Sequence, residues 1–430
     1  MSSKILSLAG LTSMSRRALA ATVAVALATL CTPGASASGA AADAAASVAN
    51  CGWVSSWATA LTTASPFDTG RSLSGFDNES IRMIVQTSIG GGLVRLRLSN
   101  AYSASDLTIG DATVALPTTP STPALDPRTL RQLSFRGRRS VTVPAGGEVL
   151  SDPVPMLVQP LSQLAVTLYL PKATGPVAWH WFARQTAFIY DGDHAMDTAG
   201  AGATETAEHV YLLAAVEVPD DRQTDGAVAV LGDSISDGPF LALDSNTRWP
   251  DFLARRIASN RRGALGVLNL ALSGNAAAHD GDEVGLPELG PSGLDRLREH
   301  IYAQAGVRTV IVQLGLNDIF QHDDSSDAII AGLQQIAAEL RQHRLRVLLA
   351  TLVPATGDPS WTPVREATRQ AINHYVRTTR DADGVVDLDL ALRDPANPAQ
   401  LNPAFDNGDH VHPNEQGNIA IAGIVPLSRL

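Results

Sequence analysis

Residues 229–237 read Ala-Val-Leu-Gly-Asp-Ser-Ile-Ser-Asp, and this stretch decides the fold. The apolar run 227–231 stops abruptly at Gly232, which predicts a strand that ends in a tight turn. Ser234 then opens the next helix, where free backbone N–H groups and the positive end of the helix dipole favour a developing anion. A serine hydroxyl becomes a useful nucleophile only beside a base and an oxyanion site. We therefore expect the rest of the chain to supply both.

Strand-like and helix-like patterns alternate after Gly226. Apolar runs lie at 228–231, 265–270, 309–314, 347–352 and 385–388. Apolar residues at helical spacing lie at 249–257, 294–303, 328–340 and 364–377. Such alternation predicts a parallel sheet with helices on both faces, in which ligands bind at the carboxyl ends of the strands. Ser234 lies at such an end.

The part of the chain before Pro219 has a different pattern. Residues 164–170 alternate between apolar and other side chains, which is typical of a strand with one buried face. Glycine- and proline-rich turns such as 90–92 and 144–147 separate several short segments of this kind. We predict a β-sandwich of jelly-roll type over 51–220 and an α/β domain over 226–430, joined by an acidic linker.

The N-terminus has the features of an export signal. Lys4, Arg16 and Arg17 form a basic region, an apolar stretch follows at 18–30, and residues 35–37 read Ala-Ser-Ala, a small-x-small cleavage pattern. We predict that residues 1–37 are a signal peptide, that 38–50 are a flexible lead-in, and that the mature protein is secreted or periplasmic. Since no later stretch is apolar for long enough to span a bilayer, we expect no stable membrane anchor.

Charge and cysteine content narrow the class of protein. The formal net charge is −11, and it becomes −14 without residues 1–37, which carry three basic residues and no acid. This acidity argues against nucleic acid as a partner. If Cys31 leaves with the signal, Cys51 stands alone, without a partner for an intramolecular disulfide or a cysteine metal site. Because histidines and acids do not cluster at ligand spacings outside 409–412, we expect no metal ion and no cofactor.

Three further segments place polar residues where a site at the strand ends needs them. Asn269-Leu-Ala-Leu-Ser-Gly-Asn275 follows the second predicted strand, and Gln313-Leu-Gly-Leu-Asn-Asp318 follows the third. Asp409-His-Val-His-Pro413 lies in a loop near the C-terminus. A histidine within reach of Ser234 would take its proton, and an aspartate three residues earlier would hold the histidine tautomer.

These segments resemble, in chain order, the motifs of the SGNH (GDSL-type) hydrolases, which are serine esterases. The resemblance covers about residues 226–430 and implies a flavodoxin-like, three-layer α/β/α fold. Gly-Asp-Ser alone is a weak motif, but four motifs in the right order are a strong signal. Ile235 replaces the leucine of the GDSL consensus, which is a conservative change at a packed position.

The resemblance assigns a role to each residue that carries it. Ser234 corresponds to the nucleophile, His412 to the general base, and Asp409 to the acid that orients the base. The oxyanion hole would consist of the backbone N–H groups of Ser234 and Gly274 and the side-chain amide of Asn317. Each residue also has a structural alternative: Ser234 and Asn317 as helix caps, and Gly274 as a turn glycine.

Two alternatives remain within the C-terminal loop. His410 competes with His412 as the base, and Asp406 competes with Asp409 as the acid. The three-residue spacing from Asp409 and the proline at position 413 favour His412.

Other polar residues near the motifs are expected to support the site. Asp233 and Asp237 are predicted to hold the nucleophile turn by accepting backbone N–H groups, and Asp318 is predicted to be structural. The segment 246–250 and the long polar loop 277–291 are candidates for walls of the pocket.

The leading hypothesis is a secreted serine ester hydrolase that forms an acyl-enzyme on short acyl esters, such as acetyl groups of polysaccharides. A sandwich ahead of an SGNH domain is similar to the arrangement in some secreted carbohydrate esterases. Aromatic residues that could stack on sugar rings are Trp53, Trp57, His180-Trp181 and Trp249. One alternative is a lipase, phospholipase or thioesterase for longer acyl chains. Another is a non-catalytic carbohydrate-binding protein. The partner is a small-molecule or polysaccharide ester, and the sequence leaves the oligomeric state open.

Overall fold

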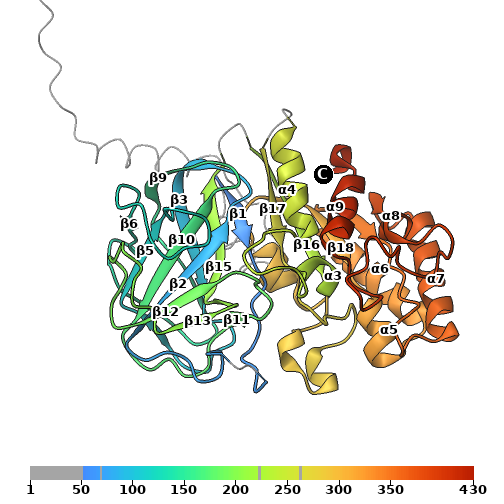
Figure 1. Ribbon diagram of the computed structural model, residues 1–430, viewed down its shortest axis with the longest axis horizontal. Coiled ribbons are helices and arrows are strands. Elements are labelled where there is room, and N and C mark those ends of the chain that lie inside the picture. The colour runs from blue at the N-terminus through green and yellow to red at the C-terminus, as the bar shows by residue number, and fades with distance from the viewer. Residues whose placement is uncertain (1–51, 68–69, 221–223, 261–263) are drawn as a thin grey trace, which may run out of the picture.

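The structure is a computed structural model that describes residues 52–67, 70–220, 224–260 and 264–430. Figure 1 shows an N-terminal region made of strands beside a C-terminal region of strands and helices. The predicted signal peptide and lead-in lie outside the described residues. Among the helices that the structure describes, none has the length and apolar character that a bilayer span requires.

The N-terminal region is a sandwich of two antiparallel sheets around one core. One sheet has the order β1-β15-β3-β8, with β9 also paired to β3, and the other has the order β13-β12-β2-β10-β5-β6. The strands of the first sheet are β1 (Trp53–Ala58), β3 (Gly91–Ser99), β8 (Glu148–Leu150), β9 (Val154–Val158) and β15 (Leu213–Pro219). Those of the second are β2 (Glu79–Gln86), β5 (Asp111–Ala115), β6 (Arg131–Gln132), β10 (Gln163–Leu170), β12 (Ala187–Asp191) and β13 (Glu205–Ala207). Two short pairs join β4 (Leu107–Ile109) to β7 (Val141–Val143) and β11 (Trp179–His180) to β14 (Val210–Tyr211). The predicted sandwich ahead of the α/β region is confirmed.

The expectation of one buried face per strand is wrong for β10. Leu164 and Val166 face the core between the sheets, as the alternation predicts. Thr167 on the opposite face is also fully buried, because the Arg82 guanidinium lies over it and its Nε donates to Thr167 Oγ1 at 2.9 Å. Arg82 Nη1 also donates to the carbonyl of Pro123 at 2.6 Å. Loops thus cover the outer face of this sheet and hide a polar side chain that the sequence pattern assigns to solvent.

The C-terminal region contains a five-stranded parallel sheet with the order β17-β16-β18-β19-β20. Counted along the region, this order is 2-1-3-4-5, the order of flavodoxin-like sheets. The strands are β16 (Thr224–Gly232), β17 (Ala264–Asn269), β18 (Val307–Gln313), β19 (Arg346–Ala350) and β20 (Gly384–Val386). The predicted parallel sheet and its α/β class are confirmed.

Helices cover both faces of this sheet (Figure 1). α4 packs against α9 on one face, and α6 packs against α7 on the other. The helices are α3 (Ser234–Asp237), α4 (Trp249–Ser259), α5 (Leu316–His322), α6 (Ser326–Gln342), α7 (Pro363–Thr378), α8 (Leu388–Leu392) and α9 (Glu415–Ile424). Short 3₁₀ turns lie at η1 (Gly281–Val284), η2 (Pro287–Leu289) and η4 (Leu427–Arg429).

Two segments with apolar residues at helical spacing differ in how well the pattern predicts their structure. α6 starts after Ser325, whose hydroxyl accepts the N–H of Ala328, and it buries an apolar stripe that includes Ile329 and Leu333, as predicted. The segment 294–303 instead contains the π-helix η3 (Leu297–Tyr302). Arg296, directly before η3, is fully buried and donates to Asn275 Oδ1 at 3.1 Å. The apolar spacing alone does not reveal this inward-facing arginine.

A hydrophobic cluster separate from the interior of the sandwich spans the boundary between the two regions. Val54 of β1 and Val218 of β15 belong to the same buried cluster as Val228 of β16 and Leu268 of β17. The N–H of Val267, on the outer edge of β17, donates to the Ser88 hydroxyl at 3.0 Å. The sandwich thus covers an edge of the parallel sheet that would otherwise expose unpaired backbone groups. The domain limits 51–220 and 226–430 stay a proposal based on the change of pattern.

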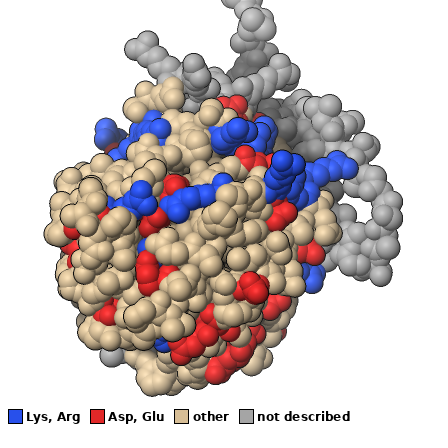
Figure 2. Space-filling view, turned by 90° about the vertical axis from the view of Figure 1, so that its right-hand side faces the viewer, with Lys and Arg blue, Asp and Glu red and all other residues tan. Residues whose placement is uncertain are grey.

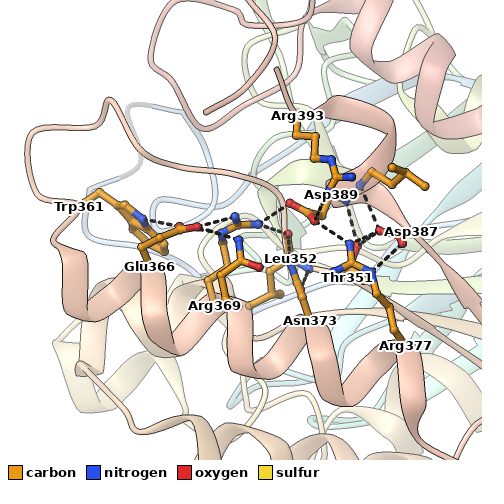
Figure 3. Close-up of polar contacts among 12 residues, drawn as sticks. Thr351, Leu352, Trp361, Glu366, Arg369, Asn373, Arg377, Asp387, Asp389 and Arg393 are labelled. Carbon is orange, nitrogen blue, oxygen red and sulfur yellow. Dashed lines mark hydrogen bonds and ion pairs between the residues drawn. The ribbon is translucent and has the colours of Figure 1, made fainter. Parts of the chain in front are cut away.

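A buried charge network fixes the carboxyl end of β19 (Figure 3). Arg369 of α7 is fully buried, and its Nη1 donates to Asp389 Oδ1 at 2.7 Å and to the carbonyl of Leu352 at 3.1 Å. Its other two nitrogens donate to Glu366 at 2.9 and 2.7 Å. Asp389 is only 1% exposed and also accepts from Arg377 at 2.6 Å. The network ties α7 and α8 to the loop after β19.

Replacing Arg369 with Met is expected to destabilise the protein by about 2–4 kcal/mol, because it leaves the Asp389 carboxylate buried with fewer cations. Chemical denaturation should show a lower midpoint for Arg369→Met than for the wild type. Arg128→Met is the matched control, since it breaks an ion pair in which the Arg128 side chain is 87% exposed. Equal midpoints for Arg369→Met and Arg128→Met would contradict a stabilising role for the network.

Candidate active site

The predicted site residues meet at the carboxyl ends of β16, β17 and β18. Ser234 is the first residue of α3, directly after β16, and Gly274 lies in the loop that follows β17. Asn317 lies in the first turn of α5, after β18. The loop before α9 brings in Asp409 and His412. In an open sheet of this order, the strand order reverses between β16 and β18, and ligand sites form at that reversal.

Ser234, His412 and Asp409 form a continuous hydrogen-bonded chain. His412 Nε2 lies 2.7 Å from Ser234 Oγ, and His412 Nδ1 lies 2.6 Å from Asp409 Oδ2. Because the carboxylate accepts from Nδ1, the lone pair of Nε2 faces the serine hydroxyl. This is the arrangement in which an imidazole acts as a general base toward a serine.

Asp409 stays ionised over the working range of such a base. Partial burial raises the pKa of its carboxyl group, but the hydrogen bond from the His412 ring and the backbone N–H groups of His412 and Val411 outweigh this effect. The resulting pKa of Asp409 is about 2. The two N–H groups donate to Asp409 Oδ1 at 2.8 and 2.9 Å. The carboxylate therefore orients the ring without titrating near neutral pH.

The alternative acid and base form a separate pair. His410 Nδ1 lies 2.7 Å from Asp406 Oδ2, and the His410 side chain is 53% exposed. In the described part of the chain, neither residue contacts Ser234. Asp406 also accepts the N–H of Gly408 at 2.8 Å, so this pair shapes the loop that carries His412.

Three donors are available beside the serine. Within the described segments, the N–H groups of Ser234 and Gly274 have no protein acceptor. Asn317 Nδ2 donates one hydrogen to the carbonyl of Asn275 at 2.9 Å, and its Oδ1 accepts from Gln321 at 3.3 Å. These contacts fix the orientation of the amide and leave its second N–H free. The set matches the donors that an oxyanion requires.

Gly274 has a conformation that requires glycine. Its φ is +80°, and a Cβ atom there would lie 2.7 Å from the Leu289 side chain. Any larger residue would shift either the backbone or the η2 turn. The loop 277–291 thus packs directly against the donor segment.

The same loop is anchored from both sides. Asp318 Oδ2 accepts the N–H of Ala277 at 2.9 Å, and Asp318 Oδ1 accepts that of Ala278 at 3.0 Å. Asn275 Nδ2 donates to the carbonyls of Leu289 and Pro291 at 2.9 and 2.7 Å. Asp318 therefore has the structural contacts expected of it, and the loop forms a fixed wall.

Comparison with known proteins places this geometry in a family. The sequence profile of the GDSL-like Lipase/Acylhydrolase family matches residues 230–419. This chain contains a GDSL-like acylhydrolase domain and is a carboxylic ester hydrolase. A comparison with curated protein sequences found no match for the hydrolase.

Several solved structures are similar to the hydrolase. A family two carbohydrate esterase from Clostridium thermocellum, in complex with cellohexaose, is 13% identical over 87% of this chain and 96% of that chain, with a TM-score of 0.36. A family two carbohydrate esterase from Cellvibrio japonicus is 13% identical over the same shares, with a TM-score of 0.34. A psychrotrophic esterase from Pseudoalteromonas is 16% identical over 46% of this chain and 93% of that chain, with a TM-score of 0.33.

The nucleophile turn of the hydrolase is supported by a buried polar network. Asp233 Oδ1 caps α3 by accepting the N–H of Ile235 at 3.0 Å and also accepts from Gln313 Nε2 at 2.9 Å. Gln313 Oε1 accepts from the Ser236 hydroxyl at 2.7 Å, and Ser236 Oγ in turn accepts from Trp249 Nε1 at 3.0 Å. Gln313 ends β18, so one side chain links two strand ends at the turn.

Burial raises the pKa of Asp233 to about 6, although the hydrogen bonds from Ile235 and Gln313 lower it in part. The Oδ2 atom of Asp233 is buried and has no partner in the described part of the chain. An unfolded aspartate titrates near pH 4, so the folded state binds the proton more tightly than the unfolded state. This contribution to stability is complete below about pH 4 and is lost as the pH rises through about 6.

Asp233→Asn is expected to remove this pH dependence. Between pH 5 and 7, the wild type should lose about 1 kcal/mol of unfolding free energy relative to the variant, because only Asp233 releases a proton in that range at this site. Urea denaturation of both proteins at the two pH values measures the difference. Parallel pH profiles would show that Asp233 does not titrate between pH 5 and 7 in the folded protein.

The structure adds contacts that the sequence motifs do not reveal. Phe240, which is 60% exposed, lies against His412 with a ring-centroid distance of 4.7 Å. Phe240 therefore covers part of the His412 ring. His180 of the sandwich contacts Asp237 of the nucleophile helix. Nothing in the spacing of His180, which lies 57 residues before Asp237, connects the two.

A further histidine cluster lies beside the loop wall. His279 has ligand atoms within 4.8 Å of those of Glu283 and His322, and also of Asp318 and Asp324. Its two ring nitrogens lie 2.8 Å from Glu283 and 2.7 Å from Asp324. Burial lowers the pKa of His279, but these two hydrogen bonds outweigh the effect and raise it overall. The geometry is that of an imidazolium held by two acids. The expectation that the enzyme works without a metal ion stays a prediction.

A cavity of about 860 Å³ lies at the opposite end of the parallel sheet. Its lining includes four arginines, namely Arg308, Arg341, Arg344 and Arg346. Figure 2 shows basic side chains in a band across the upper part of the right-hand face of the molecule, with acidic side chains gathered below. Since the cavity opens at the amino ends of the strands, it is separate from the site at Ser234.

Proposed function

We propose that the enzyme hydrolyses short acyl esters of carbohydrates through a Ser234–His412–Asp409 triad and an acyl-enzyme intermediate. The observation that carries this proposal is the hydrogen-bonded chain from Ser234 through His412 to Asp409, with distances of 2.7 and 2.6 Å. The coarser conclusion, a GDSL-type carboxylic ester hydrolase, rests on the family match. The triad, the substrate and the export of the protein are parts of the proposal.

In the first half-reaction, Ser234 Oγ attacks the ester carbonyl carbon while His412 Nε2 takes the hydroxyl proton. The carbonyl oxygen becomes an oxyanion that accepts from the N–H groups of Ser234 and Gly274 and from Asn317 Nδ2. Asp409 stabilises the imidazolium of His412. The C–O bond to the alcohol then breaks, His412 gives the proton to the leaving oxygen, and the acyl group remains on Ser234.

In the second half-reaction, water replaces the alcohol. His412 Nε2 takes a proton from water, and the resulting hydroxide attacks the acyl carbon of the Ser234 ester. The same three donors bind the second oxyanion. Collapse returns the proton to Ser234 Oγ and releases the carboxylic acid.

A cavity beside the nucleophile loop supports a carbohydrate as the alcohol. It has a volume of about 390 Å³, and its lining includes Trp181, Phe182, Arg184 and Leu243. The Trp181 and Phe182 rings stack with a centroid distance of 4.4 Å, and Arg184 Nη2 donates to the carbonyl of Leu241 at 2.7 Å. Leu243 lies in the same loop as Phe240, which contacts His412.

The lining of this cavity combines flat apolar rings with hydrogen-bonding groups. Its polar side chains include Glu205, Glu208 and His209. A sugar presents an apolar ring face, which can stack on the aromatic rings, and a rim of hydroxyl groups, which can bind the polar side chains. In the described loops that carry the site, Phe240 is the one large apolar side chain that is exposed, which favours a short acyl group over a long chain.

The predicted signal peptide makes export part of the proposal. A polysaccharide ester is a substrate that an exported enzyme meets outside the cell. The acidic net charge argues against nucleic acid as the main partner.

The substrate proposal is tested with acetylated xylo-oligosaccharides and a series of p-nitrophenyl esters from acetate to palmitate. We expect acetate release from the oligosaccharide and a rate that falls as the p-nitrophenyl acyl chain lengthens. A maximum at long acyl chains, with no acetate release, would replace the carbohydrate ester by a lipid ester. No turnover of any ester by the wild type would overturn the proposed function itself.

Trp181→Ala is expected to raise KM for the acetylated oligosaccharide about tenfold, because it removes one stacking surface. The kcat/KM for p-nitrophenyl acetate should stay close to that of the wild type, since this ester has no sugar to stack. Trp181→Phe is the matched control and should retain most of the oligosaccharide affinity. An equal loss on both substrates would place Trp181 in the fold of the site instead of in sugar binding.

A further inference from the structure

A histidine of the β-sandwich reaches into the nucleophile turn. His180 ends β11, and its Nε2 lies 2.9 Å from Asp237 Oδ1, while its Nδ1 lies 2.8 Å from the carbonyl oxygen of Ala60. The side chains of His180 and Asp237 are only 3% and 2% exposed. Asp237 is the last residue of α3, the helix that Ser234 begins.

The two contacts fix the orientation of the ring. The carbonyl of Ala60 can only accept, so Nδ1 carries a hydrogen. Burial raises the pKa of Asp237, but the charge of His180 and the hydrogen bond from its ring outweigh this effect and lower it. Asp237 Oδ1 lies within hydrogen-bond distance of Nε2, so one buried hydrogen bond joins the two side chains.

The second oxygen of Asp237 holds the oxyanion loop. Asp237 Oδ2 accepts from the backbone N–H of Ser273 at 3.0 Å and from its hydroxyl at 2.7 Å. Ser273 directly precedes Gly274, whose free N–H is the proposed oxyanion donor. On the other side, the N–H of Asn275 donates to the carbonyl of Leu272 at 3.1 Å. One carboxylate thus connects the helix of the nucleophile to the strand end that presents the donor.

Other charged groups surround this pair but do not replace His180. The positive charge of Arg248 acts on Asp237 from a distance, while its Nη2 donates to the carbonyl of Phe182 at 3.0 Å. Asp237 also acts on the charge of Arg296. Burial lowers the pKa of His300 to about 3, so this neighbour of His180 is neutral. Among the described residues, His180 is the basic side chain in hydrogen-bond contact with Asp237.

We propose that His180 is a positioning residue, through which the β-sandwich holds Asp237 and thereby sets the Ser273–Gly274 segment relative to Ser234. This inference rests on the proposed function. Without His180, the Oδ1 atom of the buried Asp237 loses its partner, and the carboxylate gains by rotating toward solvent or another donor. The bonds to Ser273 are then lost, and the Gly274 N–H moves out of line with the oxyanion. Small displacements of this kind reduce the rate of the chemical step more than the binding of substrate.

His180→Ala is expected to lower kcat for p-nitrophenyl acetate by about 10- to 100-fold and to change KM much less. Adding Asp237→Asn to this variant should restore kcat to within about fivefold of the wild type. The reason is that the amide oxygen introduced by Asp237→Asn still accepts from Ser273, and no unpaired charge remains buried. A residue that only stabilises the fold would show the opposite, since a second core substitution lowers stability further.

His194→Ala is the matched control, because His194 forms another His–Asp pair in the sandwich, with Asp197 at 3.4 Å, and should leave kcat unchanged. If His180→Ala does not fold, Asp237→Asn and Asp237→Ala test the proposal instead. Asp237→Asn keeps the contacts with Ser273 and should retain kcat. Asp237→Ala removes these contacts and should lower kcat. The proposal is overturned if folded His180→Ala keeps wild-type kcat, if the double variant shows no recovery, or if Asp237→Ala equals Asp237→Asn. These results all require an active wild type, so they are distinct from failure of the proposed function.

Discussion

Ser234→Ala is expected to lower kcat for p-nitrophenyl acetate by about 10⁴- to 10⁶-fold. The variant loses the atom that forms the acyl-enzyme in the proposed mechanism. His412 and the oxyanion donors remain and can assist only direct attack by water. KM should change little, because the Ser234 hydroxyl is a small part of the surface that contacts the ester.

The loss should be visible in a second measurement that does not depend on turnover. An organophosphonate ester should phosphonylate the wild type at one site, seen as a single mass increment, and should leave Ser234→Ala unmodified. Ser259→Ala, at the exposed end of α4, is the matched control and should behave as the wild type. Wild-type activity in folded Ser234→Ala would rule out the serine mechanism.

Asn317→Ala is expected to lower kcat about 10²- to 10³-fold, because it removes one preorganised donor to the oxyanion. The amide is already held in place by the carbonyl of Asn275 and the side chain of Gln321, so binding of the ester requires no reorganisation. The donor acts when negative charge develops on the carbonyl oxygen. The loss should therefore fall on kcat, with KM nearly unchanged.

Steady-state kinetics with p-nitrophenyl acetate separate the two parameters. A rise in KM with unchanged kcat would show that Asn317 binds the ground state of the ester instead of its oxyanion. Gln321→Ala gives an internal comparison, since it frees the Asn317 amide to rotate but keeps the donor. Its loss of kcat should be smaller than that of Asn317→Ala.

Local chemistry makes much of the C-terminal region predictable from sequence. An apolar run that ends in Gly232, and a helix with apolar residues such as Ile329 and Leu333 at helical spacing, encode their own structure over a few residues. The fixed order of a flavodoxin-like sheet then brings Ser234, Gly274 and Asn317 to one edge. The sequence therefore predicts both the fold and the residues that meet at the site.

Features that depend on distant contacts are not predictable in the same way. The pairing of β1 with β15 joins residues more than 150 positions apart, and no local pattern specifies it. Thr167 is buried because Arg82 covers it, although its position in the alternation assigns it to solvent. The contact of His180 with Asp237 arises only when both regions have folded against each other.

The continuous core between β1, β15 and β17 has a consequence for how the enzyme meets a polymer. When a sugar-binding module is joined to a catalytic domain by a flexible linker, the module binds the surface and keeps the catalytic domain at a high effective concentration near it. Here the sandwich shares buried residues with the parallel sheet, so it has no freedom to swing. If the substrate is the polysaccharide ester proposed above, the hydrolase approaches it with both regions as one unit, and an ester is reachable only where the polysaccharide chain conforms to the surface that carries Trp181 and Ser234.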